Sequence, residues 1–271
     1  MATLTHQGTA LVTGASSGLG AVYADRLARR GYDLILVARN QERLNALAQR
    51  LTRETGRTVE VLPADLSTSA DRARVEEVLK SDASITMLVN NAGLGGTGPL
   101  LESNVDKMEE TIDVNVTALM RLTYAVVPAF VARSKGTIIN IASVVALAPE
   151  ILNGVYGGTK AFVLAFSQSL RKELADKGVR VQAVLPGATA TEFWEVAGDS
   201  LDRLPKEWVM SAEDMVDASL SGLDQGEFVT IPALPDAADW DALEAARHKL
   251  HPNLSHASPA ARYGLKANVA A

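Results

Sequence analysis

The chain has 271 residues, of which 47% are hydrophobic and 21% are charged, a balance typical of a globular protein with enough apolar material for a core. Its formal net charge of −6 argues against a nucleic-acid-binding face, which needs clustered lysine and arginine. The sequence has no cysteine, which excludes disulfides, thiolate catalysis and cysteine-ligated zinc. We find no secretory signal pattern and no stretch of membrane-spanning length, so we expect a cytoplasmic protein without a membrane partner.

Short apolar runs alternate with longer segments of helical spacing along most of the chain. The predicted strands lie at 9–13, 33–38, 58–62, 85–89, 136–142, 179–185 and 227–231. The predicted helices lie at 19–30, 41–54, 70–80, 105–133, 155–177 and 212–223. Strands that are apolar throughout and alternate with helices indicate a parallel sheet covered on both faces. We predict one α/β domain over 1–271, with a doubly wound seven-stranded core at 8–231, a substrate lid at about 188–212 and a tail at 232–271.

A glycine-rich turn joins the first predicted strand to the first helix. Its glycines, Gly14, Gly18 and Gly20, have the spacing G-x-x-x-G-x-G. Such a turn brings the backbone close to a pyrophosphate and directs the N–H groups of the helix toward negative charge. Ser16 and Ser17 add hydroxyl donors. A turn without a ligand is the alternative, but the strand before it and the helix after it favour a dinucleotide site.

The end of the second predicted strand bears on which dinucleotide binds. In a Rossmann unit an acid there binds the ribose 2′-hydroxyl of NAD, and an arginine accommodates the 2′-phosphate of NADP. Here Ala38 is followed by Arg39 and no acid is present, which favours NADP(H) unless Arg39 is only a solvated loop residue. Asp65, after the third strand, either accepts a hydrogen bond from adenine or caps a helix.

Two further motifs lie later in the chain. The sequence N-N-A-G at 90–93 follows the fourth strand, at the edge where open α/β sheets bind ligands. Tyr156 and Lys160 are one helical turn apart, so the phenol and the ammonium are expected to share a face. Such a pair also arises by chance, so its meaning depends on the residues around it.

Residues 8–231 resemble the short-chain dehydrogenase/reductase family. The matching pieces occur in order: T-G-A-S-S-G-L-G at 13–20, Asp65, N-N-A-G at 90–93, Asn115, Ser143, Tyr156 with Lys160, and P-G at 186–187. The resemblance implies a Rossmann-like fold, hydride transfer between a nicotinamide cofactor and a carbonyl or alcohol substrate, no metal, and a homo-oligomer. The oligomer would be a tetramer or a dimer built from the two long helices.

The resemblance also implies roles for individual residues. Tyr156 would be the general acid/base, its pKa lowered by the Lys160 ammonium and by the positively charged oxidised nicotinamide. Lys160 would also bind the nicotinamide ribose. Ser143 would donate to the substrate oxygen, and Asn115 would hold a proton-relaying water. The implied cofactor-binding residues are Gly14, Ser16, Ser17, Gly18, Leu19, Gly20, Arg39, Asp65, Leu66, Asn91, Ala92, Gly93, Tyr156, Lys160, Pro186, Gly187, Thr189 and Thr191. One departure from the family is Gly157–Gly158, because glycine costs roughly 0.5–1 kcal/mol in a helix interior.

The substrate pocket is less clearly specified by the sequence. We expect its walls to include Val145, Ile151, Phe193 and Trp194, although the two aromatic side chains could equally serve only to pack the lid. A helix is predicted early in the tail after Pro232, and the end of the tail could be loose or dock on a partner subunit.

We therefore expect an NADP(H)-dependent carbonyl reductase or alcohol dehydrogenase. A non-catalytic dinucleotide-sensing protein and an epimerase or dehydratase on the same fold remain alternatives. The full set of catalytic residues favours an enzyme, since a sensor has no need of a proton donor. Three histidines, His248, His251 and His256, lie close together, but no nearby acid completes a ligand set, so we expect no metal site.

Overall fold

The computed structural model describes residues 6–96, 98–197 and 200–265, and the chain divides into two compact units, Met1–Pro232 and Ala233–Ala271. The first unit contains the whole sheet, and its end lies within a residue of the predicted end of the core. The second unit contains helix α9 (Ala237–His248) and the short helices η7 (His251–Asn253) and η8 (Ala261–Tyr263). The tail therefore forms a unit of its own, and its residues 266–271 lie outside the described residues.

Seven parallel strands form the main sheet, in the order β3-β2-β1-β4-β5-β6-β9. Their bounds are β1 (Thr9–Thr13), β2 (Asp33–Ala38), β3 (Val59–Pro63), β4 (Ile85–Asn90), β5 (Gly136–Ile141), β6 (Val179–Val184) and β9 (Val229–Thr230). The predicted doubly wound sheet is confirmed, with every strand present. The order reverses between β1 and β4, and the crevice at the carboxyl ends of such strands is where dinucleotides bind.

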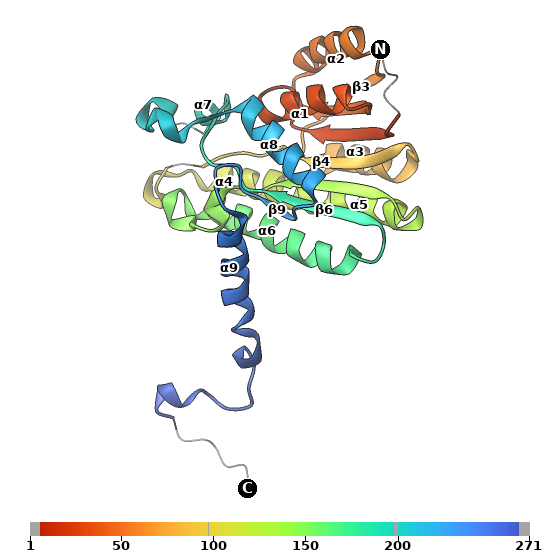
Figure 1. Ribbon diagram of the computed structural model, residues 1–271. Coiled ribbons are helices and arrows are strands. Elements are labelled where there is room, and N and C mark those ends of the chain that lie inside the picture. The colour runs from red at the N-terminus through yellow and green to blue at the C-terminus, as the bar shows by residue number, and fades with distance from the viewer. Residues whose placement is uncertain (1–5, 97, 198–199, 266–271) are drawn as a thin grey trace. The chain divides into compact units, whose positions relative to one another are not determined.

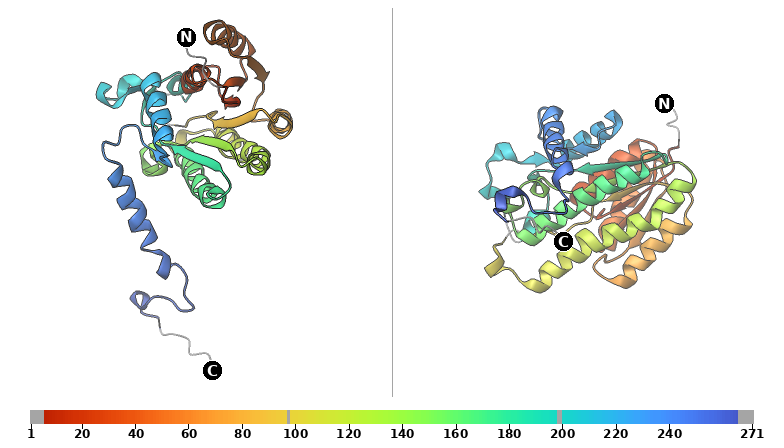
Figure 2. Two further views of the ribbon diagram at one scale, coloured as in Figure 1. Left: turned by 45° about the vertical axis from the view of Figure 1, so that its right-hand side comes forward. Right: turned by 90° about the horizontal axis from the view of Figure 1, so that it is seen from below.

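Helices cover both faces of the sheet (Figure 2). One layer contains α1 (Gly18–Arg29), α2 (Gln41–Thr55) and α8 (Ala212–Gln225), and the other contains α3 (Ser69–Ser81), α4 (Val105–Ile112), α5 (Leu119–Ala132) and α6 (Gly154–Leu174). The strands are apolar because they are buried from both sides; all five residues of β1 are buried. Between α1 and α8, the buried Tyr23 hydroxyl donates to Ser219 Oγ at 2.5 Å.

The predicted helix at 105–133 is interrupted in the structure. A π-helical segment, η2 (Asp113–Ala118), separates α4 from α5. The wider turn sets Asn115 inward, where its side chain bonds to the loop after β4 and to α6. Single π turns inside α-helices are common at functional sites. The π-helical segment here accompanies hydrogen bonds from Asn115 to distant parts of the chain. Hydrophobic spacing reflects only local sequence, so it predicts the helix but not this interruption.

The helical stretch Val105–Ala132 is also long and apolar enough to cross a membrane, with an 18-residue window of mean hydropathy 1.5. The expectation that no stretch reaches this length is therefore wrong. Half of that window is buried in the protein, and α5 packs on β4 and β5. Because core helices of soluble proteins have the same length and composition, the stretch is only a weak sign of a membrane span. The cytoplasmic location stays a prediction.

The segment predicted as a lid begins and ends in one small sheet. Strand β7 (Thr189–Ala190) pairs in parallel with β8 (Met210–Ser211), and between them lie α7 (Phe193–Val196), η5 (Leu201–Arg203) and η6 (Lys206–Trp208). Figure 1 shows α7 and α4 at the same end of the main sheet. Residues 198–199 of this segment lie outside the described residues.

Gly157 and Gly158 have different surroundings in α6, so alanine substitutions at the two positions should change the free energy of unfolding differently. Gly158 is exposed, and an added Cβ would meet no atom of the described residues within 4 Å. Gly158→Ala should therefore raise the free energy of unfolding by about 0.5–1 kcal/mol, measured by urea unfolding. Gly157→Ala is the matched contrast, since its Cβ would lie 3.0 Å from Pro149 Cβ. Equal stabilisation by both changes, or a loss with Gly158→Ala, would contradict this account.

Candidate active site

The glycine-rich loop after β1 is held in a conformation that only glycine accommodates. Gly14 and Gly18 have φ values of 66° and 52°, in the left-handed region. A Cβ on Gly20 would lie 2.2 Å from the Gly14 carbonyl oxygen, and one on Gly14 would lie 2.8 Å from Asn91 Nδ2. Close packing thus explains Gly14 and Gly20, and the left-handed backbone explains Gly14 and Gly18.

The loop leads into a helix start suited to an anion. Ser17 is the N-cap residue of α1, but among the described residues its side chain makes no capping hydrogen bond. By contrast, Asn40 and Thr68 cap α2 and α3 through their side chains. The first N–H groups of α1 therefore remain available to a phosphate, beside the partly exposed Ser16 and Leu19. These features fit the pyrophosphate of a dinucleotide.

Asn91 supports the loop from behind. Its Nδ2 donates to the carbonyl oxygens of Thr13 at 2.9 Å and Gly14 at 3.3 Å. The Thr13 hydroxyl accepts from the backbone N–H groups of Asn91 and Ala92, both at 3.0 Å, and donates to Val89 O. The predicted cofactor residue Asn91 thus has a side chain committed to joining the ends of β1 and β4. Thr13, which the sequence analysis did not assign to the site, completes this joint.

The adenosine end of the crevice lies where β2 and β3 end, joined by a bond from Ala64 N–H to Ala38 O at 3.0 Å. Arg39 is well exposed, and its Nη1 lies 3.8 Å from Glu110 Oε1 of α4. Asp65 Oδ1 accepts from the backbone N–H and the hydroxyl of Ser67, at 3.0 and 2.8 Å. Asp65 therefore shapes its own turn, and the adjacent Leu66 is buried.

Tyr156 and Lys160 share one buried face of α6, as predicted. Lys160 Nζ lies 5.7 Å from the centroid of the Tyr156 ring and donates to Ile141 O, at the end of β5, at 3.0 Å. Ser143 follows β5 directly and caps the short helix η3 (Val144–Ala146). Its hydroxyl donates to Pro186 O at 3.4 Å, and Ser143 lowers the pKa of the Tyr156 phenol. The structure thus brings together three of the four predicted catalytic side chains.

Burial controls the proton affinities of this pair. Desolvation raises the pKa of the Tyr156 phenol to about 12, opposed by the hydrogen bond with Ser143. Desolvation also lowers the pKa of the Lys160 ammonium to about 8. The expected lowering by Lys160 is therefore outweighed by the loss of water around the phenol, and the lowering expected from an oxidised nicotinamide stays a prediction. At neutral pH the phenol carries its proton and can donate it.

Asn115, the fourth predicted catalytic residue, links this centre to the loop after β4. Its Oδ1 accepts from Leu94 N–H at 2.8 Å, and its Nδ2 donates to Leu94 O at 2.9 Å and to Thr159 Oγ1 at 3.0 Å. A Cβ on Gly93 would lie 3.3 Å from Asn115 Oδ1 and 3.5 Å from Lys160 Nζ. Asn115 therefore holds the Gly93 turn against α6 beside Lys160, and its water-relay role stays a prediction.

The lid begins beside the phosphate loop. Thr189 is buried, and its hydroxyl donates to Gly187 O at 3.1 Å. The preceding Pro186 carbonyl accepts from Val144 N–H at 3.0 Å, which joins the ends of β5 and β6. A Cβ on Gly18 would lie 3.3 Å from Thr191 Cβ, so Thr191 reaches the glycine-rich loop.

The four residues of the predicted substrate wall lie in different surroundings, and their contact with substrate stays a prediction. The Phe193 ring lies 5.8 Å from the Tyr156 ring between centroids, and Val145 is buried next to Ser143. Trp194 Nε1 donates to Thr189 O at 3.0 Å, so this indole holds the lid to β7. Ile151 is exposed on η4 (Pro149–Ile151).

Two residues near the phenol were missed by the sequence analysis. Gly95 packs so closely that a Cβ would lie 2.4 Å from Phe193 Cζ. The buried Asn153 caps α6 through Val155 N–H, and its Nδ2 donates to Gly98 O at 2.8 Å. An asparagine just before a helical pattern is a recognisable cap signal, so Asn153 was open to prediction. The packing of Gly95 had no local signal.

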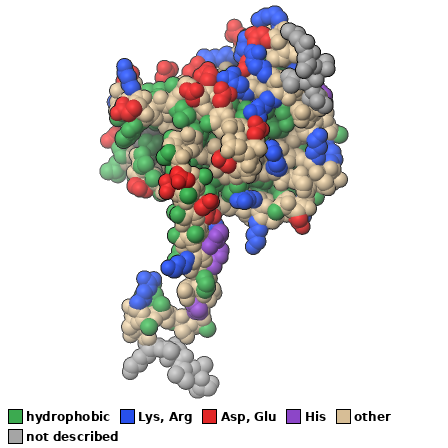
Figure 3. Space-filling model, in the orientation of Figure 1, with side chains coloured by type: hydrophobic (Ala, Val, Ile, Leu, Met, Phe, Trp, Pro, Cys, Tyr) green, Lys and Arg blue, Asp and Glu red, His purple; other side chains and the backbone are tan. Residues whose placement is uncertain are grey.

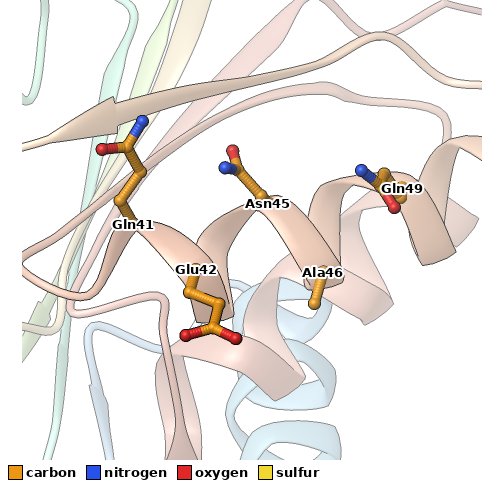
Figure 4. A pocket seen from close by; sticks show the side chains of 5 residues that line it. All are labelled: Gln41, Glu42, Asn45, Ala46 and Gln49. Carbon is orange, nitrogen blue, oxygen red and sulfur yellow. The ribbon is translucent and has the colours of Figure 1, made fainter.

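Other surface features lie apart from the catalytic residues. A depression on α2 is lined by Gln41, Glu42, Asn45, Ala46 and Gln49, all from the exposed side of that one helix (Figure 4). The rings of His248 and His251 meet edge to face at 4.9 Å between centroids. Among the described residues, no group of three or more His, Asp or Glu side chains is placed to hold a metal ion.

Comparisons with known proteins agree with this geometry. The family model described as short chain dehydrogenase matches residues 8–201. A solved short-chain dehydrogenase from Sphingobium yanoikuyae, in complex with NADPH, is 52% identical with a TM-score of 0.92 over 94% of this chain and 99% of that chain. The bulky-bulky ketone specific alcohol dehydrogenase from Comamonas testosteroni is 46% identical with a TM-score of 0.88 over 96% and 99%. Serine 3-dehydrogenase from Agrobacterium fabrum is 38% identical over 69% of this chain and 74% of its own length. With the family model matching most of its length, this chain belongs to the short-chain dehydrogenase/reductase family of oxidoreductases.

Proposed function

We propose that this protein is an NADP(H)-dependent oxidoreductase that interconverts a carbonyl compound, ketone or aldehyde, and the corresponding alcohol. The observation that carries the proposal is a buried Tyr156 phenol on the same face of α6 as the buried Lys160, whose Nζ lies 5.7 Å from the centroid of the tyrosine ring. The anion-binding start of α1 is part of the same unit. A proton donor and a dinucleotide site together are what reversible carbonyl reduction requires.

The residues divide the work of the reaction. The nicotinamide cofactor, when bound, supplies the hydride for reduction and takes it up in oxidation. Tyr156 donates its proton to the carbonyl oxygen during reduction and recovers it from the alcohol during oxidation. Ser143 donates a hydrogen bond to the same oxygen, and the Lys160 ammonium stabilises the phenolate that remains.

The alternatives have less support. A non-catalytic sensor could use the buried Lys160 and Tyr156 to bind the cofactor, but it would not need the Tyr156 phenol as a proton donor. An epimerase or dehydratase on this fold stays possible in principle, since fold does not determine reaction. The relatives with named activities, an alcohol dehydrogenase and a serine dehydrogenase, favour simple oxidoreduction.

We propose that the substrate is apolar and bulky near its carbonyl. Hydrophobic side chains gather at the end of the first unit where α4 and α7 lie (Figure 3). Exposed apolar residues are Val105 and Ile112 of α4 and Val196 of α7, and also Leu100, Leu101, Ile151 and Trp208 of neighbouring short helices. With Phe193 beside the phenol, the surroundings of the site favour apolar groups on both sides of the carbonyl. A relative is named for its specificity toward bulky-bulky ketones.

We also propose a homo-oligomer, a tetramer or a dimer, built on the outer faces of α5 and α6. Tyr124 is 68% exposed and stacks on Phe166 at 6.3 Å, and Phe166 stacks on Phe162 at 5.6 Å. A surface row of aromatic rings is more typical of an interface than of a solvated face.

The assembly proposal predicts a mass in solution of two or four chains of 28.7 kDa, measured by sedimentation at micromolar concentration. Tyr124→Glu combined with Phe166→Glu should shift the protein toward monomer, because two charges would be buried without partners. Ala46→Glu, on the exposed side of α2, is the control and should leave the mass unchanged. A monomer mass for the unaltered protein would refute the proposal.

Tyr156→Phe should leave the protein folded and able to bind NADPH but reduce turnover by at least ~10²–10⁴-fold, because it removes only the proton donor. Steady-state rates on a ketone panel, together with calorimetric NADPH binding, measure both parts. Tyr32→Phe is the matched control, because Tyr32 immediately precedes β2 and so lies at the amino ends of the strands, away from the candidate site at their carboxyl ends. Turnover close to normal in Tyr156→Phe would rule out the assigned role.

The cofactor proposal predicts that kcat/KM for NADPH is about 10- to 100-fold above that for NADH. The reason is that the Arg39 guanidinium would donate charge-assisted hydrogen bonds to the 2′-phosphate, which are worth roughly 1.5–3 kcal/mol. Ala38→Asp with Arg39→Ala should shift preference toward NADH, since the aspartate repels the phosphate and accepts the ribose hydroxyl. Arg53→Ala, in the last turn of α2, the helix that follows Arg39, controls for the loss of one positive charge. An equal or higher value with NADH in the unaltered protein would contradict the proposal.

A further inference from the structure

Two arginines lie on either side of the N-cap of α2, Arg39 before it and Arg43 in the first turn, and each is paired with a carboxylate from a later part of the chain. Arg43 Nη1 lies 2.6 Å from Glu192 Oε2, and Arg39 Nη1 lies 3.8 Å from Glu110 Oε1. Glu192 belongs to the lid, and Glu110 belongs to α4. Arg43 is thus the more closely paired of the two, although the sequence analysis considered only Arg39.

Arg43 is placed to act together with Arg39. Asn40 is the N-cap of α2 and accepts from Arg43 N–H at 3.0 Å, so the two arginines flank the cap. Arg39 precedes the cap and Arg43 lies in the first turn of α2, so both long guanidinium side chains start from the same end of this helix. Both side chains are at least half exposed and therefore free to change rotamer.

The Arg43–Glu192 pair also lies beside the phosphate loop. Glu192 follows Thr191, whose side chain approaches Gly18 at the start of α1. The pair therefore joins α2 to the lid next to the pyrophosphate site, on the adenosine side. The ribose 2′-position of a bound dinucleotide belongs to this region, at the end of β2.

We propose that Arg43 is a second specificity residue for the 2′-phosphate of NADP(H), and that Glu192 is the carboxylate which this phosphate replaces. The inference rests on the proposed NADP(H) dependence. A guanidinium binds carboxylate and phosphate through the same two-donor geometry, and the phosphate carries nearly twice the charge. An exposed pair such as Arg43–Glu192 contributes little by itself, so the exchange favours the phosphate.

The two members of the pair then have opposite effects on affinity. Arg43 increases affinity for ligands with a 2′-phosphate, whereas Glu192 competes with that phosphate and decreases it. NAD(H) has a hydroxyl at this position and leaves the ion pair in place. If the pair were only a strap between α2 and the lid, removing either partner would affect both dinucleotides alike.

The test is calorimetric binding to the full-length protein. The ligands are NADPH, NADH, adenosine 2′,5′-bisphosphate and adenosine 5′-monophosphate, and the variants are Arg43→Ala and Glu192→Gln. Arg53→Ala and Glu77→Gln, both exposed and on α2 and α3, are the matched charge controls. Arg43→Ala should weaken binding of NADPH and the bisphosphate by about tenfold or more, with little change for the other two ligands. Glu192→Gln should tighten binding of the same two ligands by up to about fivefold.

Two results would overturn the inference. One is an equal loss of affinity for NADPH and NADH in Arg43→Ala, and the other is weaker NADPH binding in Glu192→Gln. If the proposed NADP(H) dependence itself is wrong, the unaltered protein would bind NADPH no more tightly than NADH, a result that is distinguishable from these two. If the unaltered protein prefers NADPH and Arg43→Ala retains that preference in full, only the role of Arg43 is refuted.

Discussion

The close approach between the glycine-rich loop and the end of β4 is the constraint on which the rest of the site depends. Gly14 and Gly20 leave no room for a Cβ, and Asn91 bonds both carbonyls that end β1. The same contact places the next turn, at Gly93, against Lys160. One packing requirement therefore leaves the start of α1 open to an anion and also fixes the position of the loop beside Lys160.

Burial then determines the proton affinities of Tyr156 and Lys160. Tyr156 and Lys160 lie inside the fold, so water stabilises neither phenolate nor ammonium well. The resulting pKa values, about 12 and about 8, keep the transferable proton on the phenol at neutral pH. Ile141 O and the Ser143 hydroxyl supply the polar partners that make the burial of these groups tolerable.

The start of the lid connects the parts of the crevice within five residues. Thr189 bonds to the turn after β6, Thr191 approaches the glycine-rich loop, Glu192 reaches α2, and Phe193 lies against Tyr156. A movement of this short segment would therefore change contacts with α2, with the glycine-rich loop and with Tyr156 at the same time. Such coupling is typical of lids that exclude water during catalysis.

The sequence by itself determined the seven strands, the glycine-rich turn and the shared face of Tyr156 and Lys160, because these follow from local spacing and residue type. It did not show the π turn around Asn115, the supporting role of Asn91 or the pairing of Arg43 with Glu192. Each of these depends on a partner far away in the chain; Arg43 and Glu192 are 149 residues apart. The direction of the tyrosine pKa shift was also set by tertiary structure, since desolvation depends on everything that packs around the phenol.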